Sequence, residues 1–332
     1  MKMVNVGIIG AGLIGNKRAA ALEGAELIQV ADVNEESAKK LASEYNCKYT
    51  TDWKEVVSNP EIDIVFVCTT HDLLTPISVE ALQNGKHVLV EKPAGRNPDE
   101  VAQLVKAAQE SGKKVKVGFN HRYHPAMLKA KELLDSGAIG EFCYIRAVYG
   151  HGGRPGYEKE WRANPEKSGG GEMLDQGSHL IDLSRWYAGN FDDAVGFATN
   201  EFWEIPVEDN GFAILRSKEG KTAFLHASWT EWKNRFYFHI FGKTGVIEIN
   251  GLGRSYGPET LTLYKMKPEM GPPDQEVFEF PEADNSWALE FKELLAAIEE
   301  NREPLANAND ALESIKLVHK LYNWSKAHSE AK

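Results

Sequence analysis

Cysteine is scarce in this 332-residue chain, which contains only Cys47, Cys68 and Cys143. Three widely separated cysteines, none of them in a CxxC spacing, exclude a disulfide framework and a cysteine-based metal or redox motif. Reduced thiols are typical of the cytosol, so we expect a cytoplasmic protein.

Long apolar runs are also lacking. No stretch approaches the roughly 20 apolar residues of a membrane-spanning helix. The run Val4–Gly15 is apolar, but glycines interrupt it, and Asn16, Lys17 and Arg18 follow it without a cleavage pattern. We therefore expect neither a membrane span nor a signal peptide.

Positive charge is in deficit, with 38 Lys and Arg against 49 Asp and Glu and a formal net charge of −11. This balance argues against a nucleic-acid or anionic-membrane partner, although a few local arginines can still hold a small anionic ligand. The hydrophobic share of 42% and the charged share of 26% are ordinary for a globular protein and exclude disorder. At about 150 residues per domain, the length predicts two domains.

Short apolar runs alternate with helical patterns through the first 120 residues. The expected strands are Val4–Ile9, Leu27–Asp32, Ile64–Val67, His87–Val90 and Val115–Phe119. The expected helices are Leu13–Leu22, Glu35–Ser43, Leu74–Asn84 and Asp99–Glu110. Strand–helix alternation of this kind predicts an α/β domain over residues 1–120, with a doubly wound parallel sheet.

The pattern changes after residue 120, where we expect a second domain over residues 121–332. A helix after Pro125, a strand at Phe142–Tyr149, a loop at His151–Gly171 and a helix at Met173–Tyr187 come first. Gly-containing turns then join antiparallel strands at Phe212–Arg216, Thr222–Glu231, Arg235–Phe241 and Val246–Ile249. The expected end is a loop at Pro268–Pro273 and helices at Trp287–Glu300 and Asn309–Lys326.

A glycine-rich motif, Gly10-Ala11-Gly12-Leu13-Ile14-Gly15, follows the first strand and opens a helix. The first glycine suits a tight turn, the second a close approach to a pyrophosphate, and the third close helix–strand packing. Asp32 ends the second strand, where an acid would bind the adenosine ribose hydroxyls and repel a 2′-phosphate. The motif predicts NAD rather than NADP. The alternative is a glycine turn with an aspartate that caps a helix.

Lys92 follows the fifth expected strand, between Glu91 and Pro93. Ligands of open α/β sheets bind at the carboxyl ends of the strands, so Lys92 would point toward a nicotinamide. Pro93 restricts the backbone of the lysine and permits a cis bond. An ordinary surface lysine at a strand end is the alternative interpretation.

Asp175 and His179 are four residues apart in a segment rich in glycine, so on a helix they would share a face. His179 and Asp182 are close enough to pair as well. A carboxylate beside an imidazole suits a general base. The alternative without a catalytic role is a capped amphipathic helix in which Asp175 and His179 only hydrogen-bond to each other. Metal binding is disfavoured because no second histidine lies one turn away, so we expect no metal.

With these residues in hand, the chain resembles the Gfo/Idh/MocA oxidoreductase family, named for glucose-fructose oxidoreductase and inositol dehydrogenase. The resemblance covers essentially the whole chain, and its motifs occur in order at Gly10–Gly15, Glu91–Pro93, Gly118–Pro125, Trp161-Arg162 and Gly169–His179. It implies an N-terminal Rossmann domain and a C-terminal α/β domain with a large, mostly antiparallel open sheet. In the family that sheet commonly joins subunits, so a homodimer or homotetramer is expected.

The resemblance also implies roles for individual residues. The implied catalytic group is Lys92, Asp175 and His179. The implied cofactor contacts are Gly10, Gly12, Leu13, Ile14, Gly15, Asp32, Thr69, Thr70, His71, Glu91, Lys92, Asn120 and Arg162. The implied substrate contacts are Lys92, Arg122, Tyr123, Arg154, Tyr157, Trp161, Asp175 and His179.

One stretch departs from the family pattern. Many members carry Thr-Pro-Asn after the fourth strand, with a histidine three residues after the Asn. Here Thr70 and His71 replace the proline and asparagine, and Leu74 replaces the histidine. His71 either takes a polar role at the cofactor or caps the following helix, and we favour the cap.

The resemblance implies hydride transfer between the nicotinamide and a secondary alcohol of a sugar or nucleotide-linked sugar. In this mechanism His179 removes the hydroxyl proton, Lys92 stabilises the developing oxyanion, and Asp175 orients the substrate or the base. Transient oxidation with recycled NAD, as in glycosidase-like or lyase-like relatives, is an alternative function. A non-catalytic sensor of NAD or sugar is another.

The loop His151–Gly171 holds the hints about the substrate. Arg154 and Arg162 would grip an anionic group, which favours a nucleotide-linked sugar or sugar acid over a plain cyclitol. Tyr157 and Trp161 would stack on a sugar or base, or only fix the loop. The strand aromatics are expected in the core or at a subunit interface, and they are Phe224, Trp229, Phe236 and Phe238.

Overall fold

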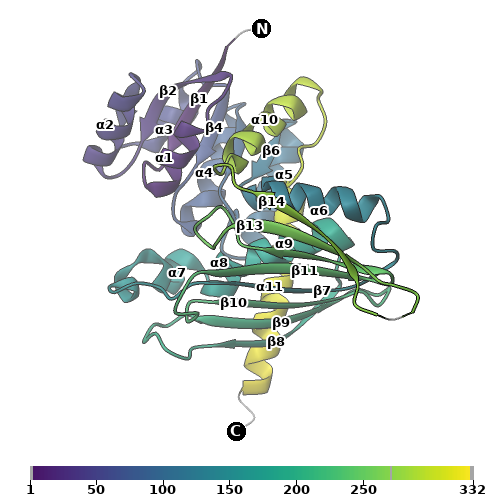
Figure 1. Ribbon diagram of the computed structural model, residues 1–332. Coiled ribbons are helices and arrows are strands. Elements are labelled where there is room, and N and C mark those ends of the chain that lie inside the picture. Colours follow the sequence, from purple (N-terminus) through teal and green to yellow (C-terminus); the bar gives the residue numbers. More distant parts are fainter. Residues whose placement is uncertain (1–2, 270, 330–332) are drawn as a thin grey trace. The chain divides into compact units, whose positions relative to one another are not determined.

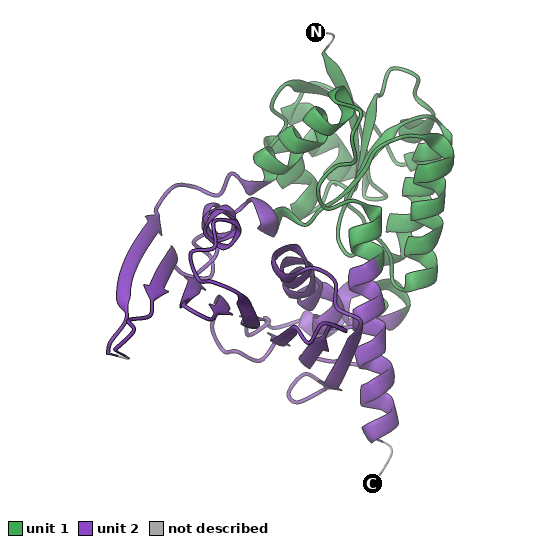
Figure 2. Ribbon diagram, turned by 90° about the vertical axis from the view of Figure 1, so that its right-hand side faces the viewer, with its two compact units in different colours: residues 1–120, 166–169, 287–312 green, residues 121–165, 170–286, 313–332 purple. Residues whose placement is uncertain are grey.

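The structure is a computed structural model that describes residues 3–269 and 271–329. The ends of the two expected domains (residues 1, 2 and 330–332) and residue 270 of the expected loop Pro268–Pro273 lie outside the described residues. The chain divides into two compact units, coloured green and purple in Figure 2. Unit 1 comprises the residues up to Asn120, Glu166–Gly169 and Trp287–Leu312. Unit 2 comprises His121–Pro165, Gly170–Ser286 and the residues from Glu313 on.

Unit 1 is built on a six-stranded sheet in the order β3-β2-β1-β4-β5-β6, with every pair of neighbours parallel. Its strands are β1 (Val4–Ile9), β2 (Ala25–Ala31), β3 (Lys48–Thr50), β4 (Ile64–Val67), β5 (His87–Val90) and β6 (Val115–Val117). Its connecting helices are α1 (Leu13–Ala20), α2 (Glu35–Glu44), α3 (Trp53–Ser58), α4 (His71–Gln83) and α5 (Pro98–Ser111). The predicted doubly wound parallel sheet is confirmed.

The order of the strands reverses between β1 and β4, which is where doubly wound sheets bind their ligands. Strands β4 and β5 are almost wholly buried, as the unbroken apolar runs in their sequences predict. The helices begin and end on local signals. The Asn34 side chain accepts a hydrogen bond from the Ser37 N–H at the start of α2, and Gly112 ends α5 in the left-handed region at φ +65°.

Helix α10 (Ser286–Glu299) belongs to unit 1 over almost its whole length, although it lies far along the chain. Phe291 and Leu294 of α10 share one hydrophobic cluster with Ile8 of β1 and Phe66 of β4. The rings of Phe66 and Phe291 meet edge to face at 5.2 Å between centroids. The sequence analysis divides the chain once, at residue 120, which would put α10 in the second domain. In the structure each compact unit is instead made of three separate segments of the chain.

Unit 2 contains an eight-stranded sheet in the order β14-β13-β12-β11-β7-β10-β9-β8, seen side by side in Figure 1. Only the β7–β10 pair is parallel among its described neighbours. The strands are β7 (Phe142–Gly150), β8 (Asp193–Thr199), β9 (Asn210–Arg216), β10 (Thr222–Ser228), β11 (Arg235–Gly242), β12 (Gly245–Asn250), β13 (Glu259–Lys265) and β14 (Asp274–Phe280). The predicted large, mostly antiparallel sheet is confirmed.

The helices of unit 2 pack against this sheet. They are α6 (Pro125–Asp135), α8 (Glu172–Asp175) and α9 (Gly177–Ala188), with α9 against β7 and β10 and α6 against β12 and β13. Short helices η1 (Asn120–Tyr123), η2 (Tyr157–Lys159), η3 (Trp161–Ala163) and α7 (Pro165–Ser168) interrupt the loops, and α11 (Ala308–Ser329) is the last helix. In the part of the chain that the structure describes, no helix is long and apolar enough to span a membrane.

Some elements differ from the sequence-based expectation. Strand β8 contains Gly196 at φ +140°, where a Cβ would lie 1.9 Å from the Phe212 carbonyl oxygen. Glycine is usually a turn signal in a sequence, and here it lies within a strand. Strand β14 is an edge strand with charged residues. The expected helix Met173–Tyr187 is interrupted at Gln176, which separates α8 from α9. The sequence analysis also did not predict β3, β13, α3 or the short helices η1, η2, η3 and α7.

A half-buried histidine of unit 1, His87, makes stability sensitive to acid. The Lys114 N–H donates to Nδ1 of His87, 3.0 Å away, so this nitrogen carries no proton. Burial, together with the charges of Lys113 and Lys114, lowers the pKa of His87 to about 4. The unfolded chain has the higher pKa, near the ordinary value of about 6.5. It therefore takes up the proton first, and stability is lost as the pH falls between these two values.

We predict that His87→Gln reduces this acid sensitivity, because glutamine keeps an acceptor for the Lys114 N–H and does not titrate. The thermal midpoint of the variant should fall less than that of the wild type between about pH 7 and about pH 5. The matched control is His328→Gln on the exposed side of α11, which should keep the wild-type pH dependence. Equal acid sensitivity in all three proteins would contradict the assignment to His87.

Candidate active site

The glycine motif of unit 1 forms a tight turn between β1 and α1. Gly10 lies at φ +99°, and a Cβ there would come 2.4 Å from the Cys68 carbonyl oxygen at the end of β4. A Cβ on Gly15 would lie 1.9 Å from the Gly10 carbonyl oxygen. Among the described residues a Cβ on Gly12 would point into open space, so backbone N–H groups at the start of α1 can be approached closely. This is the geometry that a pyrophosphate needs.

Asp32 lies directly beside this turn. Its Oδ2 accepts a hydrogen bond of 2.7 Å from the Ala11 N–H, and its Oδ1 accepts one of 2.8 Å from the Asn34 N–H. The Gly10 N–H donates to the Ala31 carbonyl at 2.8 Å. The carboxylate and the glycine turn are therefore held together at the carboxyl ends of β1 and β2, where the ribose of a dinucleotide binds in folds of this type.

The Thr69-Thr70-His71 stretch shows a role for His71 that differs from the expected helix cap. Helix α4 starts at His71, and the cap position belongs to Thr70, whose Oγ1 donates to the Asp72 carboxylate at 2.6 Å. The buried His71 ring instead places Nδ1 2.8 Å from the Ser168 carbonyl oxygen within unit 1. A carbonyl only accepts, so Nδ1 carries the proton. The favoured cap assignment is wrong, and His71 anchors the segment that precedes Gly169–Gly171.

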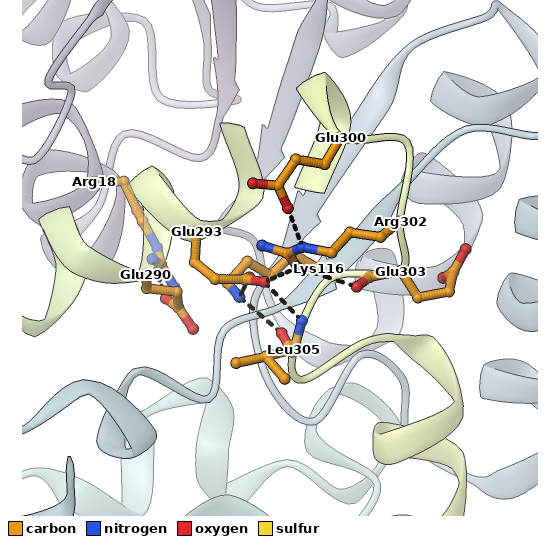
Figure 3. A network of polar contacts seen from close by, with 8 residues as sticks. All are labelled: Arg18, Lys116, Glu290, Glu293, Glu300, Arg302, Glu303 and Leu305. Atoms are coloured by element: carbon orange, nitrogen blue, oxygen red, sulfur yellow. Dashed lines mark hydrogen bonds and ion pairs between the residues drawn. The ribbon is translucent and has the colours of Figure 1, made fainter. Parts of the chain in front are cut away.

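The Glu91-Lys92-Pro93 motif follows β5 directly, and its Lys92–Pro93 bond is cis. The Glu91 carboxylate is buried against Arg18 of α1, whose Nε and Nη2 lie 2.7 and 2.6 Å from Glu91 Oε1. The same guanidinium donates from Nη1 to Glu290 Oε2 at 2.5 Å, and Figure 3 shows these two residues side by side. The motif that holds the candidate lysine is therefore fixed by a buried ion triad.

Opposite charges offset part of the cost of burying this triad. Burial acts to lower the pKa of Arg18, but the charges of Glu290 and Glu91 outweigh it and the pKa is raised. Burial raises the pKa of the Glu290 carboxyl, while Arg18 and Lys116 oppose that effect. The backbone of Gly118 lies close against this triad. A Cβ at Gly118 would come 2.6 Å from Arg18 Nη2 and 2.8 Å from Glu91 Oε2. Sequence reasoning missed Arg18 and Glu290, whose ordinary helical positions carry no local sign of burial.

In unit 2, Asp175 ends α8 and His179 lies in the first turn of α9. The Arg162 Nε donates to Asp175 Oδ2 at 2.8 Å. Both oxygens of Asp182 bind the Arg122 guanidinium, at 2.8 and 2.6 Å, and the pairing of Asp182 with His179 stays a prediction. Bidentate contacts of this kind fix geometry, so Arg122 is firmly held beside α9.

Aromatic and imidazole rings surround His179. The His121 ring stacks on the His179 ring with 3.7 Å between centroids and 20° between planes. Tyr149 lies 5.2 Å from the His121 centroid and 4.9 Å from that of Tyr256. Burial raises the pKa of Tyr149 well above its ordinary value, and Tyr256 and Glu172 add to the effect, so the phenol stays protonated. His121 stands in one of the quoted motifs, but its contact with His179 could not be predicted from spacing.

The loop arginines are already paired with acids. Arg154 is exposed and forms an ion pair of 2.6 Å with Glu160, while Arg162 binds Asp175 and also lies 3.8 Å from Glu160. Tyr157 is buried and packs on Trp229 at 4.9 Å and on Trp203 at 5.7 Å. Its contacts favour the alternative in which it fixes the loop. The Arg162 guanidinium lies 4.6 Å from the Trp161 ring.

The other expected contact residues fall into two groups. Asn120 and Tyr123 are buried in η1, whereas Leu13 is 75% exposed at the start of α1, as a residue facing a bound dinucleotide would be. Lys92 belongs to unit 1, and Asp175 and His179 belong to unit 2. The roles of all these residues stay predictions.

Within the described ranges, no three His, Cys, Asp or Glu side chains gather where they would hold a metal ion.

Comparisons with known proteins bear on both units. Residues 4–119 match a family model described as an oxidoreductase family with an NAD-binding Rossmann fold. Residues 127–248 match the GFO/IDH/MocA C-terminal domain. Among solved structures, levoglucosan dehydrogenase in complex with NADH and L-sorbose superimposes with a TM-score of 0.91 at 21% identity, over 98% of each chain.

Curated relatives are named as enzymes of sugars and cyclitols. Inositol 2-dehydrogenase of Rhizobium meliloti is 25% identical over 95% of this chain and 94% of its own. The 1,5-anhydro-D-fructose reductase of Ensifer adhaerens is 27% identical over 93% and 92%. Levoglucosan dehydrogenase of Pseudarthrobacter phenanthrenivorans is 27% identical, and the match spans 66% of this chain and 60% of that protein.

We predict that Asp32→Ala weakens NADH binding about tenfold, because a charge-assisted hydrogen bond to the ribose is worth roughly 1.5–3 kcal/mol. NADPH binding should weaken less or improve, since the charge that repels the 2′-phosphate is gone. Fluorescence titrations with both cofactors measure the ratio of the two Kd values. Asp52→Ala, which removes the acceptor for the Lys54 N–H at the start of α3, is the matched control and should leave that ratio unchanged. A ratio that Asp32→Ala does not change would refute the assignment.

Proposed function

Because the chain belongs to the Gfo/Idh/MocA oxidoreductase family, whose models match both units, we propose that it is an NAD-dependent dehydrogenase acting on a secondary alcohol of an uncharged sugar or cyclitol. The observation that carries the proposal lies in unit 1. There the Gly10–Gly15 turn, Asp32 and the Glu91-Lys92-Pro93 motif all follow the carboxyl ends of strands of one NAD-binding sheet. The free thiols of all three cysteines support a cytoplasmic location.

The mechanism assigns one task to each candidate catalytic residue. NAD, when bound, supplies the acceptor for the hydride that leaves the carbinol carbon. Lys92 donates a hydrogen bond to the alcohol oxygen, where negative charge grows as the proton leaves. His179 takes that proton on the lone pair of an imidazole nitrogen. Asp175, held by Arg162, orients the substrate hydroxyl or the base.

The pairing of the loop arginines supports an uncharged substrate. Arg154 and Arg162 each bind a carboxylate of their own unit. A nucleotide-linked sugar or sugar acid would share each guanidinium with a carboxylate that already binds it, and that negative charge weakens the attraction of either arginine for a second anion. The relatives are named for levoglucosan, inositol and 1,5-anhydro-D-fructose, which carry no charge.

We predict that the wild-type protein reduces NAD with at least one of levoglucosan, myo-inositol and related free sugars, seen as a rise in absorbance at about 340 nm. Nucleotide-linked sugars should give no rise. Lys92→Met should lose at least ~10²-fold in kcat, the effect of removing one oxyanion donor, and should retain NADH binding. Lys106→Met, on the exposed surface of α5, is the matched control and should keep wild-type rates. An active Lys92→Met protein would refute the mechanism, and a rise with nucleotide-linked sugars alone would refute the substrate class.

The sheet of unit 2 supports a homodimer or homotetramer. Tyr144, Phe197, Ile214 and Phe224 are each more than 40% exposed, and Phe224 lies opposite Ile214 in the register of β10 and β9. Other expected strand aromatics, Trp229, Phe236 and Phe238, are buried. A cluster of large exposed apolar side chains is typical of a surface that another subunit covers.

We predict that Phe224→Glu lowers the mass measured by sedimentation velocity, because the interface would have to bury an unpaired charge. Leu128→Glu, at a 41% exposed position on α6, is the matched control and should keep the mass of the wild type. A monomeric wild-type protein, or a Phe224→Glu protein of unchanged mass, would contradict assembly through this face.

A further inference from the structure

The Arg18 guanidinium of unit 1 joins three segments that are far apart in the sequence. It lies on α1, one turn after Gly15, and binds Glu91 at the end of β5 and Glu290 on α10. The exposed fractions of the Arg18, Glu91 and Glu290 side chains are 1%, 9% and 0%. The planar fork of an arginine can hold two carboxylates at once, which a lysine cannot do with the same geometry.

Glu91 transmits this constraint to the next residue, Lys92. The main chain of Glu91 is held on both sides. The Glu91 N–H donates to the Val67 carbonyl, and the Glu91 carbonyl accepts from the Ala94 N–H, both at 3.0 Å. Its side chain is held by Arg18 on one side and by the close backbone of Gly118 on the other. The peptide unit between Glu91 and Lys92 therefore has little freedom to rotate.

We propose that Arg18 and Glu290 are positioning residues for hydride transfer. They hold the backbone of Lys92 in register with the glycine turn that precedes α1, so that the Lys92 ammonium and the bound nicotinamide keep one separation. The inference rests on the proposed function, in which Lys92 is the oxyanion donor. It extends that function to a charged residue on α10, which is nearly 200 positions from the motif that it supports.

A second set of contacts on α10 provides an internal control. Glu293 lies one turn after Glu290 and binds Lys116, Arg302 and the Leu305 N–H, as Figure 3 shows. Although burial acts to raise the pKa of Glu293, Lys116 and the hydrogen bonds lower it. This set fastens α10 to β6 and to the segment that follows α10. The ion pairs of Arg18 are with Glu91 and Glu290, so we expect the loss of the Glu293 contacts to affect stability alone.

The experiment compares Arg18→Lys, Glu290→Leu, Glu290→Gln and Glu293→Leu in the full-length protein. We expect Arg18→Lys and Glu290→Leu to lose about tenfold or more in kcat with the sugar that the wild type oxidises, since a misplacement of about 1 Å can cost 10²-fold. The Kd for NADH should stay within about twofold. Glu290→Gln keeps an oxygen that accepts from Arg18 and should restore most of kcat. Glu293→Leu should lower the thermal midpoint and keep the wild-type kcat.

A second measurement needs no substrate. Amide hydrogen exchange at Glu91 and Ala94 should be about tenfold faster in Glu290→Leu and unchanged in Glu293→Leu. Unchanged exchange in Glu290→Leu would overturn the inference, and so would equal losses of kcat in Glu290→Leu and Glu293→Leu. An active Lys92→Met protein would overturn the proposed function itself. An inactive Lys92→Met protein beside a fully active Arg18→Lys protein would overturn only the positioning role.

Discussion

The burial of one positive charge, that of Arg18, constrains the construction of unit 1. A guanidinium removed from water needs carboxylates close by, and here they come from residues 91 and 290. Several other features follow from this need. Trp287 covers the guanidinium at 4.4 Å from its ring centroid, Gly118 leaves room for the ion pair, and α10 returns from the distant part of the chain to the parallel sheet. Phe291 then fills the apolar core beside Phe66.

Much of the parallel sheet was predictable from the sequence, because its central strands, such as β4 and β5, are almost wholly buried. The bounds of β1, β4 and β5 agree with the predicted ranges, since unbroken apolar runs with turn signals on either side are a local property of the chain. Strand β8 was missed because it contains Gly196, and β14 because its exposed edge carries acids. The place of α10 in unit 1 is set by distant partners, such as Arg18, which is 272 residues from Glu290, and no local pattern indicates them.

The candidate site divides in the same way. The positions of the glycine turn, Asp32 and the Glu91–Pro93 motif were predictable because each directly follows a recognisable strand of the parallel sheet. The partners of the charged side chains were not found. The sequence predicts that Arg154 and Arg162 bind an anion, but it does not indicate that Glu160 and Asp175 are their partners within the chain. His71 looked like a helix cap, whereas its ring reaches the Ser168 carbonyl. Sequence identifies which groups can bind a ligand, and tertiary contacts decide which of them are already engaged.

The late position of α10 has a consequence for how this protein is made. A ribosome completes β1 to β6 long before it adds Trp287–Leu312. Until those residues emerge, Arg18 stays hydrated and the core around Ile8 and Phe66 lacks Phe291 and Leu294. Unit 1 therefore stays incomplete, with apolar surface exposed, while the ribosome synthesises the strand-rich region of unit 2. Chaperones that shield apolar surface would act during this interval.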